Sequence, residues 1–331
     1  MNKLTVLRLC KRSLIFISLL LFYHLNAQTS LKWKMLSSDA NPAIKHPLHL
    51  FLLNDSTLYL GTHHYLCKVD SVELTKVYYN ADEKSVIRSV VQHNDTIFFS
   101  VQNHGIYYIG KDYTDIHSTP FSRNESTYWS MCTFNHQLVV SGHPRKIAFY
   151  DTLEYGWKYS FDLIQNAQGT IFQIEQHGHE LFATLYEGGV FKWEHDKWIA
   201  INKGLPEDLT VRGIIMYHDK QLVASDHGIY YRKSNSSAWK PANGDLSDVK
   251  ISEIISDENM LIATGVNGEL FISNDEGVHW NKILIENAQG YIIHSAAIMK
   301  NKLYLSAEST NTNPSGVFTI PLTDIRKHTI D

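Results

Sequence analysis

The chain has 331 residues, of which 44% are hydrophobic and 19% are charged. That composition is too apolar for a disordered polyelectrolyte, and the length suits two ordinary domains or one large β domain. The formal net charge is −4, and the first 27 positions hold four basic residues and no acidic one. The rest of the chain is therefore more acidic still, so we expect no nucleic-acid partner.

Residues 1–27 have the three parts of a secretory signal peptide. Basic residues come first, an apolar run follows at Leu14–Tyr23, and the segment ends on the small residue Ala27. The run is about half as long as a helix that crosses a bilayer, and no later apolar run is long enough to span one. We therefore expect a bacterial-type secreted, periplasmic or cell-surface protein with a mature domain of residues 28–331. An uncleaved membrane anchor is the alternative.

A structural unit recurs seven times in the mature chain. It consists of an apolar strand, a polar turn, a second strand, a glycine-containing loop, a third strand and, in most copies, a tryptophan. The first apolar residue after each turn falls at Leu58, Ile97, Leu138, Leu181, Leu222, Leu261 and Leu303. Short alternating strands at this spacing predict an all-β, seven-bladed β-propeller with four antiparallel strands per blade and no helices. A solenoid of β-turns is the alternative.

The phase of the tryptophans predicts how the ring closes. Those of the fourth strands are Trp157, Trp198, Trp239 and Trp280. Each precedes the next register mark by 22 to 24 residues, and Trp33 precedes Leu58 by 25. After the seventh third strand, residues 316–320, no tryptophan follows. We therefore predict that residues 31–35 complete the last blade by pairing with 316–320, which removes the open sheet edges.

Two cysteines remain after the signal segment, Cys67 and Cys132. A secreted domain of this size has a core large enough to fold without a disulfide. We expect two buried free thiols, and a single bridge between them is the alternative. The spacing of the cysteines and histidines is not that of a metal site, so we predict no metal and no cofactor.

Residues 273–280 read Ser-Asn-Asp-Glu-Gly-Val-His-Trp. This is similar to the Asp-box, Ser-x-Asp-x-Gly-x-x-Trp, of sialidases, sortilin-type receptors and related BNR-repeat propellers. The repeat rhythm of residues 31–331 also resembles the ligand-binding sensor propellers of bacteria. The resemblance implies a fold-stabilising turn away from any catalytic centre, formed by Ser273, Asp275, Gly277 and Trp280. Asp275 is suited to accept backbone N–H bonds and Gly277 to take a positive φ, and a binding role is the alternative.

The resemblance to sialidases also raises the question of catalysis. Sialidases use three arginines that grip a carboxylate, a tyrosine–glutamate pair and an acid. The mature chain has six arginines, and none lies in the Phe-Arg-Ile-Pro context of those enzymes. Arg88 and Arg212 share a first-strand position and are expected near the channel. We therefore favour a non-catalytic module with no catalytic residues. A sialidase-like hydrolase or lyase is the alternative, which carboxylates and arginines clustered in the channel mouth would support.

The loops between second and third strands supply the candidate ligand-binding residues. They are His63, His64, His104, His143, Arg145, Glu187, Asp226 and His227. In a propeller these loops share a face with the blade-to-blade connections, and function tends to lie on variable loops of a rigid scaffold. The sequence thus predicts a monomer that binds a protein or glycan ligand at this loop face, with a pH dependence between about 5.5 and 7.5 set by histidine. A solvated rim without a ligand and a divalent-metal site are the alternatives.

The exported protein should begin at Gln28, because cleavage follows a small residue that ends the apolar part of a signal peptide. Intact-mass spectrometry of the exported protein measures this directly. Recovery of the chain in the membrane fraction with residues 1–27 attached would contradict it.

Overall fold

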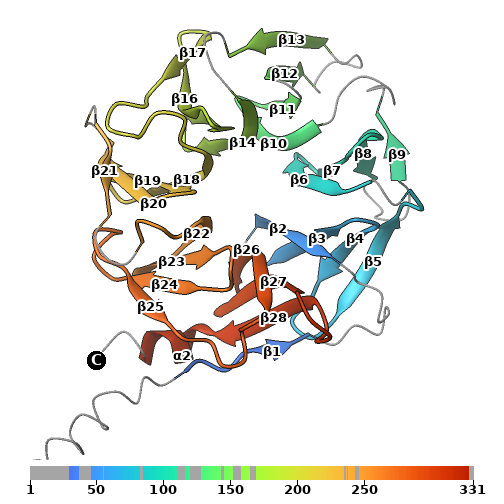
Figure 1. The fold of residues 1–331 in the computed structure, drawn as a ribbon. Helices are drawn as coiled ribbons and strands as arrows, with labels where there is room; N and C mark the ends of the chain where they lie inside the picture. The colour runs from blue at the N-terminus through green and yellow to red at the C-terminus, as the bar shows by residue number, and fades with distance from the viewer. Residues whose placement is uncertain are drawn as a thin grey trace, which may run out of the picture.

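The structure is a computed structural model. It describes residues 30–36, 46–54, 56–82, 85–110, 116–119, 128–142, 145–151, 158–164, 169–234, 236, 238–242 and 246–327. These residues form seven four-stranded antiparallel sheets, arranged as the blades of a ring (Figure 1). The chain is therefore the seven-bladed β-propeller that the repeat predicts. The predicted signal segment, residues 1–27, lies outside the described residues.

Each blade is a meander whose first strand lies innermost (Figure 1). Blade 1 consists of β2 (Pro47–Asn54), β3 (Thr57–Thr62), β4 (Tyr65–Val69) and β5 (Leu74–Tyr79), and blade 2 of β6 (Ile87–His93), β7 (Thr96–Val101), β8 (Gly105–Ile109) and β9 (Ile116–Ser118). Blade 3 consists of β10 (Tyr128–Phe134), β11 (Gln137–Gly142), β12 (Lys146–Asp151) and β13 (Lys158–Leu163), and blade 4 of β14 (Thr170–His177), β15 (Glu180–Tyr186), β16 (Gly189–Glu194) and β17 (Lys197–Ala200).

Blades 5 to 7 follow the same plan, except that the last is completed by the first strand of the chain. Blade 5 consists of β18 (Val211–Tyr217), β19 (Lys220–Ser225), β20 (Gly228–Lys233) and β21 (Lys240–Pro241). Blade 6 consists of β22 (Ile251–Asp257), β23 (Met260–Gly265), β24 (Leu270–Ser273) and β25 (Asn281–Ile283). Blade 7 consists of β26 (Tyr291–Met299), β27 (Lys302–Ser309), β28 (Gly316–Pro321) and β1 (Lys34–Met35).

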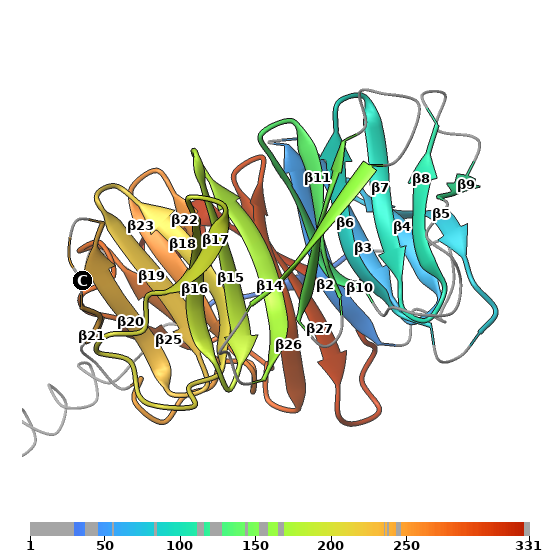
Figure 2. The same ribbon diagram turned by 90° about the horizontal axis from the view of Figure 1, so that it is seen from above.

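The seven register marks of the repeat all lie on the second strand of a blade and are at most 3% exposed. Among the described residues, the buried apolar side chains form seven clusters, and each cluster fills the space between two neighbouring blades. The sheets of neighbouring blades pack face to face around the ring (Figure 2). Every blade therefore depends on the blades at both of its sides for its core.

The ring closes through the two ends of the chain, as the tryptophan phase predicts. Strand β1 pairs antiparallel with β28, with Lys34 opposite Thr319 and Met35 opposite Phe318. The ring of Trp33 stacks on Phe318 with 4.2 Å between centroids. The last blade is thus built from residues almost 300 positions apart in the sequence.

A short helix, α2 (Leu322–Lys327), follows the last strand, although the sequence patterns predicted no helix. Leu322 and Ile325 are at most 1% exposed and pack into the cluster between blades 6 and 7. Six residues are too few to show a helical repeat in the sequence, so burial of these two side chains decides the conformation. No helix in the described part of the chain is long and apolar enough to cross a membrane.

Both cysteines are free thiols, and Cys67 is buried as expected. Cys132 is only half-buried, because it lies on an innermost strand, at the wall of the channel. Burial raises the pKa of the Cys67 thiol to about 12. Trp157, one of the predicted fourth-strand tryptophans, lies outside the described residues.

Replacing Trp33 with alanine should weaken ring closure, because it removes the stacking on Phe318 and Tyr291. The loss of a partly buried aromatic side chain should cost about 2–3 kcal/mol and lower the melting temperature by roughly 4–6 °C. Thermal unfolding followed by circular dichroism measures the change. Lys32→Ala is the control, since that side chain is 85% exposed. Equal melting temperatures for the Trp33 variant and the wild type would contradict the role of this segment.

Candidate functional site

The centre of the ring holds a cavity of about 530 Å³ that the innermost strands of all seven blades line. Its wall combines apolar side chains with ionisable ones. The histidine, arginine and glutamate side chains of the wall are His49, Arg88, Glu175, Arg212, Glu253 and His294. The cavity is therefore the part of the described surface where charged groups from several blades converge.

Each innermost strand carries a β-bulge near its beginning. One residue per strand has no partner in the register with the second strand, namely Leu48, Arg88, Trp129, Phe172, Arg212, Ser252 and His294. We call this set the bulge ring. Because the first strands begin at the face that also carries the second-to-third-strand loops, the bulge ring lies toward that mouth of the channel. Bulges redirect side chains, and here five of them reach the cavity wall.

Three members of the bulge ring are held in the same way. Each bonds to an acceptor 14 positions later, near the end of the second strand of its own blade. The pairs are Arg88 with Gln102 at 2.9 and 2.7 Å, Arg212 with Asp226 at 2.9 Å, and His294 with Glu308 at 2.9 Å. A repeated backbone irregularity therefore presents three nitrogen-bearing side chains at the channel mouth and fixes each of them.

Blades 7, 1 and 2 are neighbours in the ring, and they place His294, His49 and Arg88 on one side of the cavity. We call these three residues the basic arc. Burial lowers the pKa of His49 to about 4, and the positive charges of Arg88 and His294 add to the effect. His49 is therefore neutral at physiological pH, and burial lowers the pKa of Arg88 as well. The field of Arg88 thus acts across this part of the cavity.

Two carboxylates, Glu175 and Glu253, lie on the wall formed by blades 4 and 6. Burial raises the pKa of Glu253 to about 7, and the charge of Glu175 contributes, although two hydrogen bonds act in the opposite direction. Those bonds come from the Ala296 N–H at 2.6 Å and the Ser295 hydroxyl at 2.8 Å, both on the next blade. Glu253 thus joins blade 6 to blade 7 and titrates near neutral pH.

The same bond between blades recurs elsewhere around the channel. In blades 2 and 3 the residue after the bulge is serine, and its hydroxyl accepts a backbone N–H from the following blade. Ser89 accepts from Met131 at 3.0 Å, and Ser130 accepts from Ile174 at 3.1 Å. Glu253 has the equivalent position in blade 6. In blade 4, Glu175 lies two residues beyond the position that follows the bulge, and it accepts the Ile214 N–H of blade 5 at 3.1 Å.

Seven of the eight candidate residues lie in the described part of the chain, and His143 lies outside it. The seven come from blades 1 to 5, so they encircle the mouth rather than gather at one point. The structure joins Asp226 to the channel through Arg212. His104 contacts Asp82 at 2.8 Å, and His63 lies beside His46 with 5.0 Å between ring centroids.

Arg88 and Arg212 line the cavity, as their shared first-strand position suggested. Sequence reasoning missed His49, Glu175, Glu253 and His294 as channel residues. A signal was present, because each is an ionisable residue in a first strand, within three positions of the place that Arg88 and Arg212 occupy in the repeat. Among the residues described, no group of three or more His, Cys, Asp or Glu side chains is placed to hold a metal ion.

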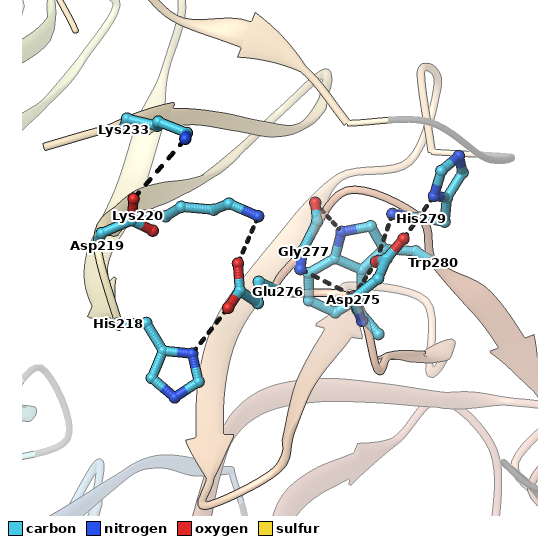
Figure 3. A network of polar contacts seen from close by, with 10 residues as sticks. His218, Asp219, Lys220, Lys233, Asp275, Glu276, Gly277, His279 and Trp280 are labelled. Carbon is cyan, nitrogen blue, oxygen red and sulfur yellow. Dashed lines mark hydrogen bonds and ion pairs between the residues drawn. The ribbon is translucent and has the colours of Figure 1, made fainter.

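Residues 273–280 form a tight turn between β24 and β25 (Figure 3). The Ser273 hydroxyl accepts the Gly277 N–H at 2.9 Å, and Asp275 accepts the His279 N–H at 2.8 Å. Gly277 has φ 83°, and a Cβ there would lie 2.1 Å from Leu222 of the neighbouring blade. Trp280 is 4% exposed and packs into the cluster between blades 5 and 6.

The same turn contacts the neighbouring blade through Glu276 (Figure 3). Its carboxylate bonds to Lys220 at 2.8 Å and to His218 at 3.1 Å, both in the first hairpin of blade 5. The third-to-fourth-strand turns share a face with the first hairpins, so this network lies at the end of the blades opposite the bulge ring. It joins two blades and supplies none of the residues of the cavity wall.

No family model matches the sequence, and no curated protein matches it. Solved structures are similar in fold. The extracellular domain of a protein described as a hybrid two component system, BT4673 from B. thetaiotaomicron, is 11% identical with a TM-score of 0.72. The match covers 88% of this chain and 40% of that one, so the chain spans about two fifths of that protein's length.

Two structures of YCF48 match over nearly their whole length. YCF48 from Cyanidioschyzon merolae is 10% identical with a TM-score of 0.69, and the match covers 87% of this chain and 98% of that one. YCF48 bound to D1 peptide is 13% identical with a TM-score of 0.65, and the match covers 88% of this chain and 100% of that one. At these identities the likeness shows the fold: a seven-bladed β-propeller.

Glu253→Gln should change the pH dependence of stability in a defined direction. Because the pKa of Glu253 rises from 4.5 to about 7 on folding, its contribution is fully present below pH 4.5 and is lost as the pH rises to about 7. Glutamine cannot ionise, and its carbonyl oxygen can still accept the Ala296 N–H. The variant should therefore melt roughly 2–4 °C above the wild type at pH 8 and at a similar temperature near pH 4.5.

Thermal scans between those pH values test this expectation. Glu258→Gln, the same change on an exposed turn, is the matched control and should follow the wild type throughout. A Glu253→Gln variant that is destabilised equally at every pH would show that the carboxylate is ionised without cost in the folded protein.

Proposed function

We propose that the chain is a non-catalytic binding module whose ligand, a protein segment or a glycan, lies over the channel mouth on the face of the second-to-third-strand loops. The bulge ring is the observation that carries this proposal. It directs Arg88, Arg212 and His294 to one mouth, and acceptors within their own blades hold each in place. Polar groups that converge on a partly apolar cavity and are fixed before binding are typical of ligand sites.

The difference between the two faces supports the same choice. On the opposite face Glu276 joins blade 6 to blade 5 through Lys220 and His218. Such bonds between neighbouring blades stabilise the ring. We also propose that residues 273–280 are an Asp-box, as in BNR-repeat propellers, with this structural role.

The similar structures bear on the kind of ligand and on the compartment. YCF48 was solved with a D1 peptide, and the BT4673 domain is extracellular. These facts support a protein segment as the ligand here and export of the chain through residues 1–27. On that basis we propose that the chain acts outside the cytoplasm, and we propose a monomer because one chain closes its own ring.

A carbohydrate-active enzyme is the second candidate. Glu175 and Glu253 line one cavity together with Arg88 and Arg212, and a carboxyl group with a pKa near 7 can serve as a general acid. The bonding of the carboxylates argues against catalysis, because both accept backbone N–H groups of the next blade. A panel of fluorogenic glycosides separates the candidates: turnover that Glu253→Gln abolishes would establish the enzyme.

A double substitution on each face tests where the ligand binds. A ligand is first found with a glycan and peptide array probed with the mature chain. His104→Ala with His227→Ala, on the loop face, should weaken binding roughly tenfold. His218→Ala with His279→Ala removes two histidines from the opposite face and is the matched control.

Fluorescence anisotropy with the labelled ligand measures both affinities, and circular dichroism confirms that both variants fold. Equal affinities for the wild type and the loop-face variant, combined with a loss in the control variant, would place the ligand on the opposite face.

A further inference from the structure

We infer that the ligand is a protein segment that inserts a lysine side chain into the channel, where its ammonium group binds among Gln173, Glu175 and Glu253. This deepens the proposed function and rests on it. The observation behind it is a gap in the channel wall at Gly213 of blade 5, with oxygen acceptors on the blades at both of its sides.

The gap is a break in a repeated pattern. The residue that follows the bulge lines the cavity in every blade, namely His49, Ser89, Ser130, Gln173, Gly213, Glu253 and Ser295. Six of these residues have polar side chains, and Gly213 has none. A Cβ at Gly213 would lie 3.2 Å from Glu175 Oε1 and 3.5 Å from Gln173 Oε1, both on blade 4. The space beside Gly213 is therefore bordered by acceptors.

Two of the acceptors are not used within the described part of the chain. The bonds that Glu253 accepts from Ser295 and Ala296 both end on Oε2, and Oε1 accepts none from the described residues. The side-chain amide of Gln173 likewise forms no hydrogen bond with them. Both side chains are half-buried and line the cavity, so both oxygens are open to a donor on a ligand.

Charge decides which donor fits. Glu175 and Glu253 lie on the blades that flank Gly213, and the charge of Glu175 helps to raise the pKa of Glu253. Arg212, the residue before Gly213, bonds to Asp226 at 2.9 Å, which neutralises its charge. This side of the cavity therefore favours a cation. An ammonium group is compact, carries one positive charge and donates three hydrogen bonds, which suits three acceptors around a small gap.

The apolar part of the wall indicates lysine as the source of the ammonium. Ile214 and Ile254 follow Gly213 and Glu253 in the sequence, are at most 8% exposed and line the same cavity. Such a surface can cover the four-carbon stem of lysine while the acceptors hold its charged end. The N-terminus of a peptide has the same charge and donors but no stem.

The probe is Nα-acetyllysinamide, and Nα,Nε-diacetyllysinamide is its neutral match. Binding is followed at pH 8 by NMR of the labelled mature chain, using the backbone amide signals at positions 213 and 214, up to about 50 mM because a ligand of this size binds weakly. The charged probe should shift these signals saturably, and the neutral one should not. Alaninamide carries an α-ammonium instead. Tighter binding of alaninamide at pH 7 would assign the site to a peptide N-terminus and overturn the lysine.

Two substitutions test the site itself. Glu253→Gln removes a charge and should raise the dissociation constant for Nα-acetyllysinamide roughly tenfold, the effect of losing one charge-assisted contact. Glu258→Gln is its control. Gly213→Ala fills the gap and should weaken binding at least several-fold. Gly316→Ala is the control for this change, because neither glycine has a positive φ and a Cβ at Gly316 meets only Met35 at 3.5 Å. Thermal unfolding confirms that all four variants fold.

The pH dependence gives a further readout. Glu253 loses its proton near pH 7, so the probe should bind several-fold more tightly at pH 8 than at pH 5.5. The other titratable and charged groups on and around the cavity wall are His49, Arg88, Glu175, His177, Arg212, Asp226, His294 and Glu308. None of them becomes more positive as the pH rises, so their titration acts in the same direction. In Glu253→Gln the change with pH should be smaller.

The outcomes separate this inference from the proposed function. An array peptide that depends on the loop face but binds equally with its lysines acetylated would overturn the ammonium while leaving the binding module intact. The inference also fails if both probes bind alike, or if Glu253→Gln and Gly213→Ala bind Nα-acetyllysinamide as well as the wild type. If every array ligand depends on the opposite face, the proposed function fails, whatever the small probe does.

Discussion

Closure of the ring is the constraint on which the rest of the structure depends. A ring of seven sheets has a complete core only if the seventh blade meets the first, because each apolar cluster needs a wall on both sides. Strand β1 has only two residues, but its neighbours add to it: Leu31 exchanges backbone bonds with Leu284 and Glu286 at 2.7 Å each, and Leu36 donates to Val317 at 2.8 Å. The segment therefore reaches across from blade 7 to the rim of blade 6.

The closed ring positions the channel side chains. Hydrogen bonds from one innermost strand to the next hold these strands at a fixed separation. The bulge next to each bond sets the direction of the bulge residue's own side chain. In blades 2, 3 and 6 the position after the bulge makes the bond, and five of the seven bulge positions line the cavity. One irregularity, repeated around the ring, thus separates the structural role from the presenting role at adjacent residues, as at Glu253 and Ser252 in blade 6.

The sequence was sufficient to predict the blade count, the strand order and the closing segment, because these features follow from the spacing of apolar residues. Trp33 is the clearest case: its phase relative to Leu58 placed it in the last blade. The bulges could not be predicted in this way. A bulge is defined against the partner strand, and the extra residue in a strand such as β22 leaves the apolar pattern of that strand intact.

The channel carboxylates were missed for a related reason. The sequence around Glu253 does not reveal its role. Only its place one residue after a bulge shows that it forms the same bond between blades as Ser89 and Ser130. The loop residues were easier to select, since loops carry polar residues in most proteins. For the same reason they were less informative, although Asp226 bonds to Arg212 of the channel wall.

Burial explains why the bulge ring can present a charged side chain to the cavity and the second strands cannot. The second strands are almost wholly buried, and in β19 and β23 every residue is. A ligand-binding charge there would be inaccessible and costly. A loop side chain is accessible but loses more conformational freedom when it binds. The bulge positions described in side-chain detail are half-buried, which lets a side chain such as Arg88 be held by its own blade and still face the cavity. They are therefore where, under the proposed function, a change of residue would alter ligand preference with the least disturbance to the core.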